Sequence, residues 1–533
     1  MQGSRVPDVG FVMSDPVGRE NGSEVIGRGQ LREAALGGVR WITTARLVAE
    51  ASQFIAMIVL ARLISPTEFG YAAIALIVQG LVVATTSEGI TTPLVQKKAL
   101  RSAHVAGAQA VVLVLGVTLT ALTAALAPLV VEPAFGPETA HLVQLASLLF
   151  VISSIGVVPQ ALLQRELQFR RISVAEIISS SVGASVAVVL ALVGLEGEAV
   201  VLGVVAASLT FYTTLFVFAR PPAPRWRYRE IREIIAFGAP ASLSSVLRSG
   251  FRNIDYVILG LVAGPATVGY YWRAFQLGVE YQRKISGIMV RIALPIYSRA
   301  SNLSDMQAVR DRIVRVNASI LFPILTILIA TAPEVIPWMF GPEWEPAVVP
   351  TQILAVAGMC AAILSGVGPL ILAVGRPKAL LAWDAASFVV YAVGVYLAAG
   401  YGVVALCLAV TGIFVLQLLV AHVFLLRPIA GVPARRALLD ILPASVASAA
   451  LVVVAVPIVK VLGNNPIPTA GTLTAAVLGG LGCYVLTLRW LFPGAWSDTS
   501  LVLSRVVSLE QVRTWLGRVR RARRAVKPMS YDT

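Results

Sequence analysis

The stretch Val246–Lys284, VLRSGFRNIDYVILGLVAGPATVGYYWRAFQLGVEYQRK, decides how the rest of the chain is interpreted. It predicts two membrane-spanning helices joined by a tight Gly-Pro turn. On the first helix, Arg248, Arg252 and Asp255 are spaced i, i+4 and i+7, so they share one face. A charge near the centre of a bilayer costs about 2.5–3.5 kcal/mol on insertion scales, so such residues normally face a bundle interior or a wet cavity.

On the second helix, Arg273, Gln276 and Glu280 are spaced i, i+3 and i+7, so they also share one face. Both helices of the hairpin therefore predict a polar face inside the membrane, with more positive than negative charge. The working hypothesis is a cationic cavity that handles an anionic substrate. The aromatic residues that open the second helix, Tyr270–Trp272, are expected at the external membrane interface.

The composition indicates an integral membrane protein. Of the 533 residues, 57% are hydrophobic and 13% are charged, and the mean hydropathy is +0.81. A soluble protein of this length lacks the interior volume to bury so many apolar residues. The net charge of +15 alone would suggest nucleic-acid binding, but the positive residues form short clusters between apolar runs, as in cytoplasmic membrane loops. We therefore expect no nucleic-acid partner.

Apolar runs of the length that crosses a bilayer, about 20 residues, predict fourteen spans. They are approximately 39–62, 69–91, 104–131, 140–163, 173–194, 198–219, 231–262, 268–292, 313–332, 347–372, 379–399, 402–425, 438–461 and 470–492. With the N-terminus inside, the outward loops contain no Lys or Arg, and every inward loop contains at least two Lys or Arg residues. This positive-inside segregation predicts that both termini are cytoplasmic. The bias toward Arg, Ala, Val and Gly suggests a bacterial source, hence the bacterial cytoplasmic (inner) membrane.

Two sequence echoes divide the chain into halves. ARLISPTEFGY (Ala61–Tyr71) aligns with GLVAGPATVGY (Gly260–Tyr270) at a shift of 199 residues, and FGPE occurs at Phe135–Glu138 and again at Phe340–Glu343. The identical pairs of the first echo are Pro66 with Pro265, Gly70 with Gly269, and Tyr71 with Tyr270. Because each half has an even number of spans, the halves are expected to be parallel repeats around a cavity.

The predicted fold class is all-α integral membrane, with about 14 transmembrane helices arranged as two six-helix lobes plus two C-terminal helices. The expected parts are a flexible cytoplasmic tail (1–34), an N-terminal six-helix lobe (35–219), a basic cytoplasmic linker (220–230), a C-terminal six-helix lobe (231–426), two additional transmembrane helices (438–492) and a basic amphipathic cytoplasmic tail (498–533).

The first half carries its own intramembrane charges. Arg46, Glu50 and Gln53 are spaced i, i+4 and i+7 on the first span, and Glu88 lies near the end of the second. Arg252 occupies the position equivalent to Gln53, so most of the positive charge lies in the second half. The candidates for proton or sodium coupling are Glu50, Glu88, Asp255 and Glu280, and the sequence does not choose among them.

Several motifs together resemble one family. They are ARLISPTEFGYAAIALIVQG with the following LVQKK, RELQFRRISVAE, NIDYVILGLVAGPATVGYYWRAFQL, PIYSR and VGRPKA. Over roughly residues 35–490 the chain resembles the Wzx-type polysaccharide flippases of the multidrug/oligosaccharidyl-lipid/polysaccharide (MOP) exporter superfamily. The resemblance implies two lobes around a central cavity, and movement of polyprenyl-diphosphate-linked oligosaccharides from the cytoplasmic to the outer leaflet. Envelope or extracellular polysaccharide biosynthesis is the implied process.

The resemblance also implies that arginines line the cavity, here Arg46, Arg248, Arg252 and Arg273 as substrate-binding residues. Arginine suits a diphosphate because its planar guanidinium binds phosphate oxygens bidentately. The alternative is structural pairing, of Arg248 or Arg252 with Asp255 and of Arg273 with Glu280. Positive residues outnumber carboxylates in these hairpins, so pairing does not account for all of them.

Other functions remain open at this point: a lipid II flippase or a drug/cation antiporter on the same fold, and a membrane glycan polymerase. The chain has no GxxxxGK[ST] loop, HExxH motif or Cys/His ligand spacing, so we expect no enzyme activity, no cofactor and no metal. The expected partners are a lipid-linked oligosaccharide and membrane lipids, with a polysaccharide polymerase or glycosyltransferases as candidates, and the protein is expected to be a monomer.

Overall fold

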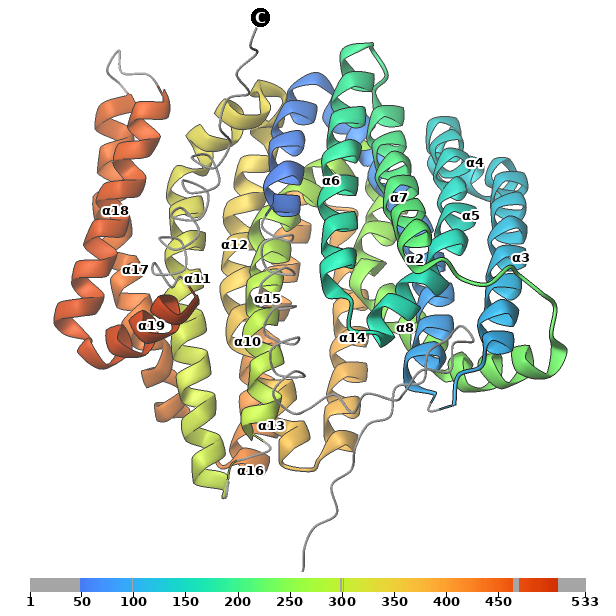
Figure 1. Ribbon diagram of the computed structural model, residues 1–533. Coiled ribbons are helices and arrows are strands. Elements are labelled where there is room, and N and C mark those ends of the chain that lie inside the picture. Colours follow the sequence, from blue (N-terminus) through green and yellow to red (C-terminus); the bar gives the residue numbers. More distant parts are fainter. Residues whose placement is uncertain (1–47, 98, 298–299, 301, 464–468, 507–533) are drawn as a thin grey trace, which may run out of the picture. The chain divides into compact units, whose positions relative to one another are not determined.

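The computed structural model describes residues 48–506 except 98, 298–299, 301 and 464–468. Within that range some helical side chains, those of Glu88, Arg248 and Arg252 among them, are not described. The described residues form helices and connecting turns, with no β-strand (Figure 1). The predicted all-α class is confirmed. The predicted N-terminal tail, Arg46 and most of the predicted C-terminal tail lie outside the described residues.

A helix over residues 48–63 precedes the labelled elements. These are α2 (Pro66–Gln96), α3 (Ser102–Leu126), α4 (Glu132–Phe135), α5 (Pro137–Arg165), α6 (Phe169–Leu192), α7 (Gly197–Ala219), α8 (Tyr228–Ala263), α9 (Pro265–Phe275), α10 (Tyr281–Tyr297), α11 (Leu303–Phe340), α12 (Val348–Leu364), α13 (Val367–Ala373), α14 (Pro377–Ala399), α15 (Val403–Ala421), α16 (Arg427–Ala430), α17 (Ala434–Gly463), α18 (Thr469–Leu491) and α19 (Pro493–Val506). Short π-helical segments are η1 (Ala127–Val131), η2 (Gln276–Glu280) and η4 (His422–Leu426), and η3 (Pro342–Ala347) is a 3₁₀-helix.

Ten helical segments of the described residues are long and apolar enough to cross a membrane. They coincide with the predicted spans 3–6 and 9–14, so the chain is a multi-pass membrane protein. The helices at the other four predicted spans (residues 48–63, α2, α8 and α9–α10) form the two hairpins to which the sequence assigns intramembrane charge. The total of fourteen spans stays a prediction.

One predicted loop is shorter than expected. The sequence places an external loop from Pro333 to Pro346, but α11 continues as a helix to Phe340. Its interior prolines at 323, 333 and 337 do not end the helix. In a bilayer, a helix that continues keeps more of its backbone hydrogen bonds internal than a loop would, which outweighs the cost of these prolines.

Apolar side chains on α14 face away from the protein. Val389, Val393 and Leu397, spaced i, i+4 and i+8, are 57%, 52% and 64% exposed. In water such a stripe would be an aggregation risk, whereas in a bilayer it meets lipid tails. The exposed apolar face therefore agrees with a membrane location.

The described chain forms two compact units. The first contains the described residues up to Trp272, together with Met339–Glu345 and Val395–Val403. In it α5 packs against α2, α3 and α7, and α8 packs against α2. Glycines and alanines bring α6 and α7 close together: a methyl group on Gly183 or Gly203 would lie 2.5 Å from the Cβ of Ala207 or Ala187. Small residues are the usual means of close helix packing in membranes.

The second unit contains Arg273–Trp338, Pro346–Gly394 and the described residues from Val404 onward. In it η2 lies against α12 so closely that a methyl group on Gly358 would be 2.1 Å from the carbonyl oxygen of Gly278. The hairpin of α17 and α18 (Figure 1) is tied to α11 where the Tyr484 hydroxyl donates to the Ser319 carbonyl at 3.0 Å. The predicted lobe boundaries, which differ from these units, stay predictions.

Candidate functional site

The hairpin that opens the sequence argument is formed by α8 and α9. Gly264 ends α8 with φ +80°, a conformation that favours glycine, and Pro265 is the first residue of α9, where its missing N–H costs nothing. The Gly-Pro turn therefore occurs where the sequence predicts it.

Asp255 is fully buried on α8. Its Oδ2 accepts a hydrogen bond of 2.8 Å from the Tyr271 hydroxyl, and its Oδ1 accepts one of 3.1 Å from the Tyr256 backbone N–H. The rings of Tyr256 and Tyr271 meet edge to face, with centroids 5.4 Å apart. Tyr271 is not exposed as a residue of an aromatic belt would be, because its ring is fully buried and its hydroxyl donates to the buried carboxylate of Asp255.

Arg273 is 3% exposed, and its Nη1 donates to Oε1 of Gln276 at 2.9 Å. The alternative pairing of Arg273 with Glu280 is not what the structure shows. Glu280 instead faces Arg283, whose Nη1 lies 3.6 Å from its Oε2, and both of these side chains are more than one-third exposed. Gln276 and Glu280 bound the π-helical segment η2, a type of helix distortion that is frequent at functional sites.

The other predicted site residues divide as follows. Glu50 is half-buried on the first described helix and lies in the first unit with Asp255, whereas Arg273 and Glu280 belong to the second unit. The backbones of Glu88, Arg248 and Arg252 are helical, but their side chains and the whole of Arg46 are outside the description. The assignment of substrate-binding and ion-coupling roles therefore stays a prediction.

The repeat-related turns touch each other in the first unit. A methyl group on Gly70 of α2 would lie 1.8 Å from the carbonyl oxygen of Pro265, and one on Gly269 of α9 would lie 2.0 Å from the carbonyl oxygen of Pro66. These four residues are the pairs that the sequence echo aligns. Each glycine of one repeat thus contacts the proline that begins the equivalent helix of the other, at the ends predicted to face outward. We call this contact the outer closure.

Aromatic side chains surround the outer closure. Trp344 is 1% exposed, its Nε1 donates to the Ala61 carbonyl at 2.8 Å, and its ring centroid lies 5.5 Å from that of Phe69. The Tyr270 hydroxyl donates to the Glu343 carbonyl at 3.3 Å, and Nε of Arg62 donates to the Met339 carbonyl at 2.9 Å. The second copy of the FGPE echo and the tryptophan after it are therefore part of this region. The FGPE echo is visible in the sequence, but its contact with the outer closure is not.

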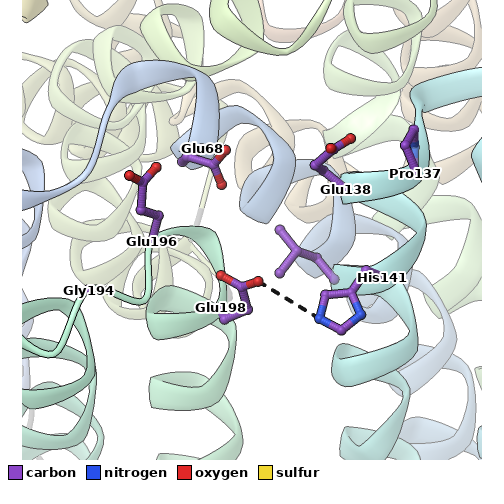
Figure 2. A pocket seen from close by; sticks show the side chains of 8 residues that line it. Glu68, Pro137, Glu138, His141, Gly194, Glu196 and Glu198 are labelled. Carbon is purple, nitrogen blue, oxygen red and sulfur yellow. Dashed lines mark ion pairs between the residues drawn. The ribbon is translucent and has the colours of Figure 1, made fainter.

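An acidic pocket of about 520 Å³ lies at the ends of α2, α5 and α7 that are predicted to face outward (Figure 2). Its titratable lining residues are Glu68, Glu138, His141, Glu196 and Glu198. Oε2 of Glu68 accepts from the Gly197 backbone N–H at 3.3 Å, and Nε2 of His141 lies 3.8 Å from Oε1 of Glu198. Burial, then the neighbouring charge of Glu196, raises the pKa of Glu68. This pocket was not predicted from the sequence, because its residues lie at the beginnings of three helices that are far apart along the chain.

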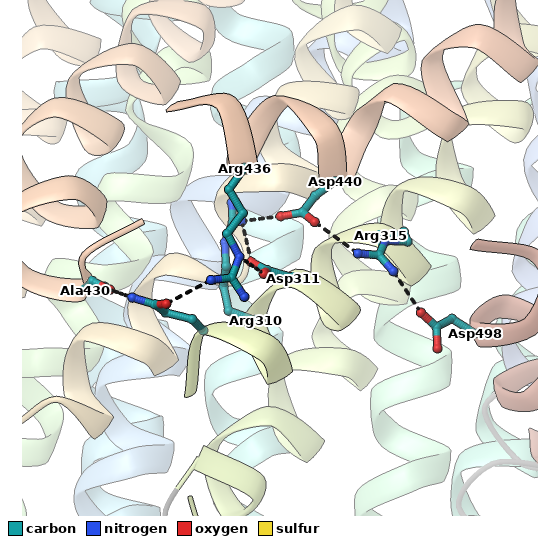
Figure 3. Close-up of polar contacts among 8 residues, drawn as sticks. Arg310, Asp311, Arg315, Ala430, Arg436, Asp440 and Asp498 are labelled. Carbon is teal, nitrogen blue, oxygen red and sulfur yellow. Dashed lines mark hydrogen bonds and ion pairs between the residues drawn. The ribbon is translucent and has the colours of Figure 1, made fainter. Parts of the chain in front are cut away.

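A buried ionic network joins α11, α17 and α19 in the second unit (Figure 3). Nη1 of Arg310 lies 2.6 Å from Asp440 and 3.0 Å from Asp311. Arg315 bridges Asp440 and Asp498 at 3.3 and 3.2 Å, and Arg436 pairs with Asp311. In the sequence, the arginines at 310 and 436 lie between predicted spans and contribute only to the positive charge of the predicted inward loops. The structure shows that Arg310 and Arg436 also fasten α17 to α11, and that Arg315 joins α19 to both helices.

The long apolar helices, the closely packed glycines and the two repeat-related hairpins define a polytopic helical membrane protein. Among solved structures, the chain is similar to the lipid II flippase MurJ in an inward closed conformation, with a TM-score of 0.66 at 12% identity over 84% of this chain and 99% of that one. It is also similar to an inward-facing multidrug-resistance MATE transporter of the MOP superfamily, with a TM-score of 0.52 at 14% identity over 70% and 93% of the chains. At these identities the likeness concerns the fold.

The chain belongs to the family described as Polysaccharide biosynthesis protein, which matches residues 59–349. One relative is the lipopolysaccharide biosynthesis protein WzxC of Escherichia coli (strain K12), which is 24% identical over 350 residues, or 65% of this chain and 71% of the relative. The resemblance to polysaccharide transporters of the MOP superfamily is thereby confirmed.

Proposed function

We propose that the protein flips a polyprenyl-diphosphate-linked oligosaccharide from the cytoplasmic to the outer leaflet by alternating access, as a step in envelope or extracellular polysaccharide biosynthesis. The family membership supports the process, and the transporter fold supports the mechanism. It acts as a transporter and not as an enzyme, in a bacterial inner membrane with both termini in the cytoplasm. A polymerase or glycosyltransferases would supply or consume the lipid-linked glycan.

The outer closure is the observation that carries the proposal. Alternating access requires a contact that closes the outer side, draws on both repeats and can be broken without unfolding either one. Gly70 with Pro265, and Gly269 with Pro66, meet backbone to backbone across such an approximate symmetry. The four residues of this contact are two glycines and two prolines, which carry no charge. Separating them therefore breaks van der Waals contacts, together with a few hydrogen bonds at the aromatic rim.

A buried arginine supports an anionic substrate. Arg273 has almost no contact with solvent, and its Nη1 donates to the side chain of Gln276. A guanidinium in such a place attracts a diphosphate more strongly than it would in water, because the local dielectric constant is low. The glycan and diphosphate then cross the membrane beside the protein's polar face while the prenyl chain remains in lipid.

The test uses the purified full-length protein in liposomes with a fluorescent polyprenyl-diphosphate oligosaccharide, and measures exchange between leaflets with a membrane-impermeant quencher. Arg273→Gln is compared with Arg283→Gln, because the two arginines lie on the same hairpin but only Arg273 is buried. Losing a hydrogen bond between charged groups costs about 1.5–3 kcal/mol. We therefore expect exchange to fall about 10- to 100-fold in Arg273→Gln and to stay near wild type in Arg283→Gln.

Three controls separate the possible outcomes. Thermal unfolding of each variant shows whether a loss of exchange reflects misfolding. If the wild type moves no lipid-linked diphosphate, the proposed function is wrong. If Arg273→Gln exchanges as fast as the wild type, the function stands and the role of Arg273 is wrong. Lipid II in the same assay tests the closest alternative substrate.

A further inference from the structure

The connection between α7 and α8 has an unusual surface for a loop. Residues 222–229 are all exposed, and two of them, Trp226 and Tyr228, are large aromatic residues that are 62% and 72% exposed. They alternate with arginines, and the exposed arginines of this region are Arg225, Arg227, Arg229 and Arg232. Exposure of large apolar rings to water is unfavourable, and exposed apolar patches usually mark a surface that contacts a membrane or another molecule.

This connection is fixed in place. The backbone N–H of Arg225 donates to the Ala106 carbonyl of α3 at 3.1 Å. Ile231 and Ile234 at the start of α8 are 6% and 2% exposed, and a methyl group on Gly107 would lie 3.2 Å from the Ile231 side chain. Because Ile231 and Ile234 are packed inward, the opposite side of the first turns of α8 faces outward in a defined orientation.

The first turns of α8 lie crosswise to α3, at the end of α3 where that helix begins (Figure 1). Their outward side also carries Ile235 and Phe237, which are 46% and 52% exposed. The helix then meets α2 backbone to backbone, since a methyl group on Gly238 would lie 1.7 Å from the Gly89 carbonyl oxygen. The segment before Gly238 therefore lies along the end of the bundle rather than within it.

The positive charge of this surface is only partly neutralised. Between residues 225 and 237 the sequence has four arginines and two glutamates. One of them, Glu233, pairs with Lys97 and accepts from His104, and it lies 3.8 Å from Arg229. The positive-inside pattern places the surface on the cytoplasmic side.

We infer that this surface, the basic linker face (Arg225–Arg229, Arg232, Ile235 and Phe237), docks on anionic phospholipid headgroups of the cytoplasmic leaflet. An acidic protein or a nucleic acid would contact the arginines but would leave the exposed apolar side chains without a role. Four large exposed apolar side chains beside four arginines fit the boundary of a bilayer, where aromatic rings sit at headgroup level and arginines meet lipid phosphates. The face anchors the connection between α7 and α8 to the membrane surface.

The test measures quenching of Trp226 by spin-labelled lipids in liposomes that contain the full-length protein. The Trp226 signal is the difference between the wild type and Trp226→Phe. Phosphatidylglycerol with a shallow spin label is compared with equally labelled phosphatidylcholine at the same mole fraction. We expect stronger quenching by phosphatidylglycerol, and a preference that weakens with added salt and falls up to about fivefold per arginine replaced by glutamine at 225, 227, 229 and 232.

The matched control replaces three exposed basic residues at other helix ends predicted to be cytoplasmic, Arg376, Lys378 and Arg427, with glutamine. The control variant is expected to keep the wild-type preference. Equal quenching of Trp226 by the two lipids would overturn the inference, as would a preference that salt does not weaken. Displacement of phosphatidylglycerol by an unlabelled polyprenyl diphosphate at low mole fraction would also overturn it, because the face would then belong to the substrate route.

Discussion

The outer closure makes a quantitative prediction for Gly70→Ala. The added methyl group would lie 1.8 Å from the Pro265 carbonyl oxygen, whereas carbon and oxygen approach to about 3.3 Å in ordinary contacts. The two helix ends must therefore separate by about 1.5 Å, or α2 and α9 must bend. Forcing a methylene-sized group into a packed contact typically costs about 1–3 kcal/mol. We expect the outward-closed conformation to lose stability by this amount relative to the outward-open one.

The assay follows the accessibility of a single cysteine. Ala61→Cys is introduced into a chain whose three native cysteines are replaced by alanine, because Ala61 is 3% exposed and its carbonyl accepts from Trp344. Labelling by a membrane-impermeant maleimide reports opening of the outer side. A cost of 1–3 kcal/mol corresponds to labelling about 5- to 150-fold faster in Gly70→Ala.

Gly80→Ala is the matched control, because Gly80 lies on the same helix and a methyl group there would meet nothing within 4 Å. It should label at the rate of the parent chain. If Gly70→Ala and Gly80→Ala label equally, the contact between the repeats does not hold the outer side closed. A gain in labelling together with a lower unfolding temperature would mean loss of fold rather than opening, so unfolding is measured in parallel.

Two predictions concern stability. Asp440→Asn should lower the free energy of unfolding by about 3–5 kcal/mol, because it leaves the buried Arg310 without full charge compensation. Asp498→Asn should lower it by about 1 kcal/mol or less, because the Asp498 side chain is 20% exposed. Thermal unfolding in detergent measures both variants, and losses of similar size would contradict this ranking. Burial and nearby carboxylates raise the pKa of Glu68, so the folded state binds a proton at this carboxylate more readily than the unfolded state does. The stability that the protonated Glu68 contributes at acid pH is therefore lost as the pH rises through the raised pKa. Glu68→Gln should therefore raise the unfolding temperature at neutral pH and change it little at acid pH, and a difference that is the same at both would refute the sign.

The sequence predicts the helices well because lipid imposes a simple rule on composition. Runs of about 20 apolar residues must be helical where no water is available, and ten of the expected spans are present as long apolar helices. The turn at Gly264 and Pro265 is equally local, since one residue needs a positive φ and the next lacks an N–H.

Contacts between distant segments were not predictable in this way. The echo revealed that Gly70 and Gly269 are equivalent, but equivalence does not imply that each touches the other's neighbour. Likewise, hydropathy records Asp440 as a charge near the end of a span and does not record that Arg310, 130 residues earlier, neutralises it. Trp344 looked like an external loop residue because nothing local distinguishes a buried tryptophan from an interfacial one.

The ionic network has a consequence for how the chain is made. Arg310 and Asp311 leave the ribosome well before the partners at 436 and 440 exist. At about 5–20 residues per second, α11 waits on the order of ten seconds before its buried charges can be matched. During that interval the end of α11 that carries Arg310, which is predicted to be cytoplasmic, must remain in the headgroup region or be covered by an insertion factor. Integration of α11 is thus completed only when the C-terminal hairpin arrives, and a nascent chain stalled before residue 436 should remain sensitive to membrane quality-control proteolysis.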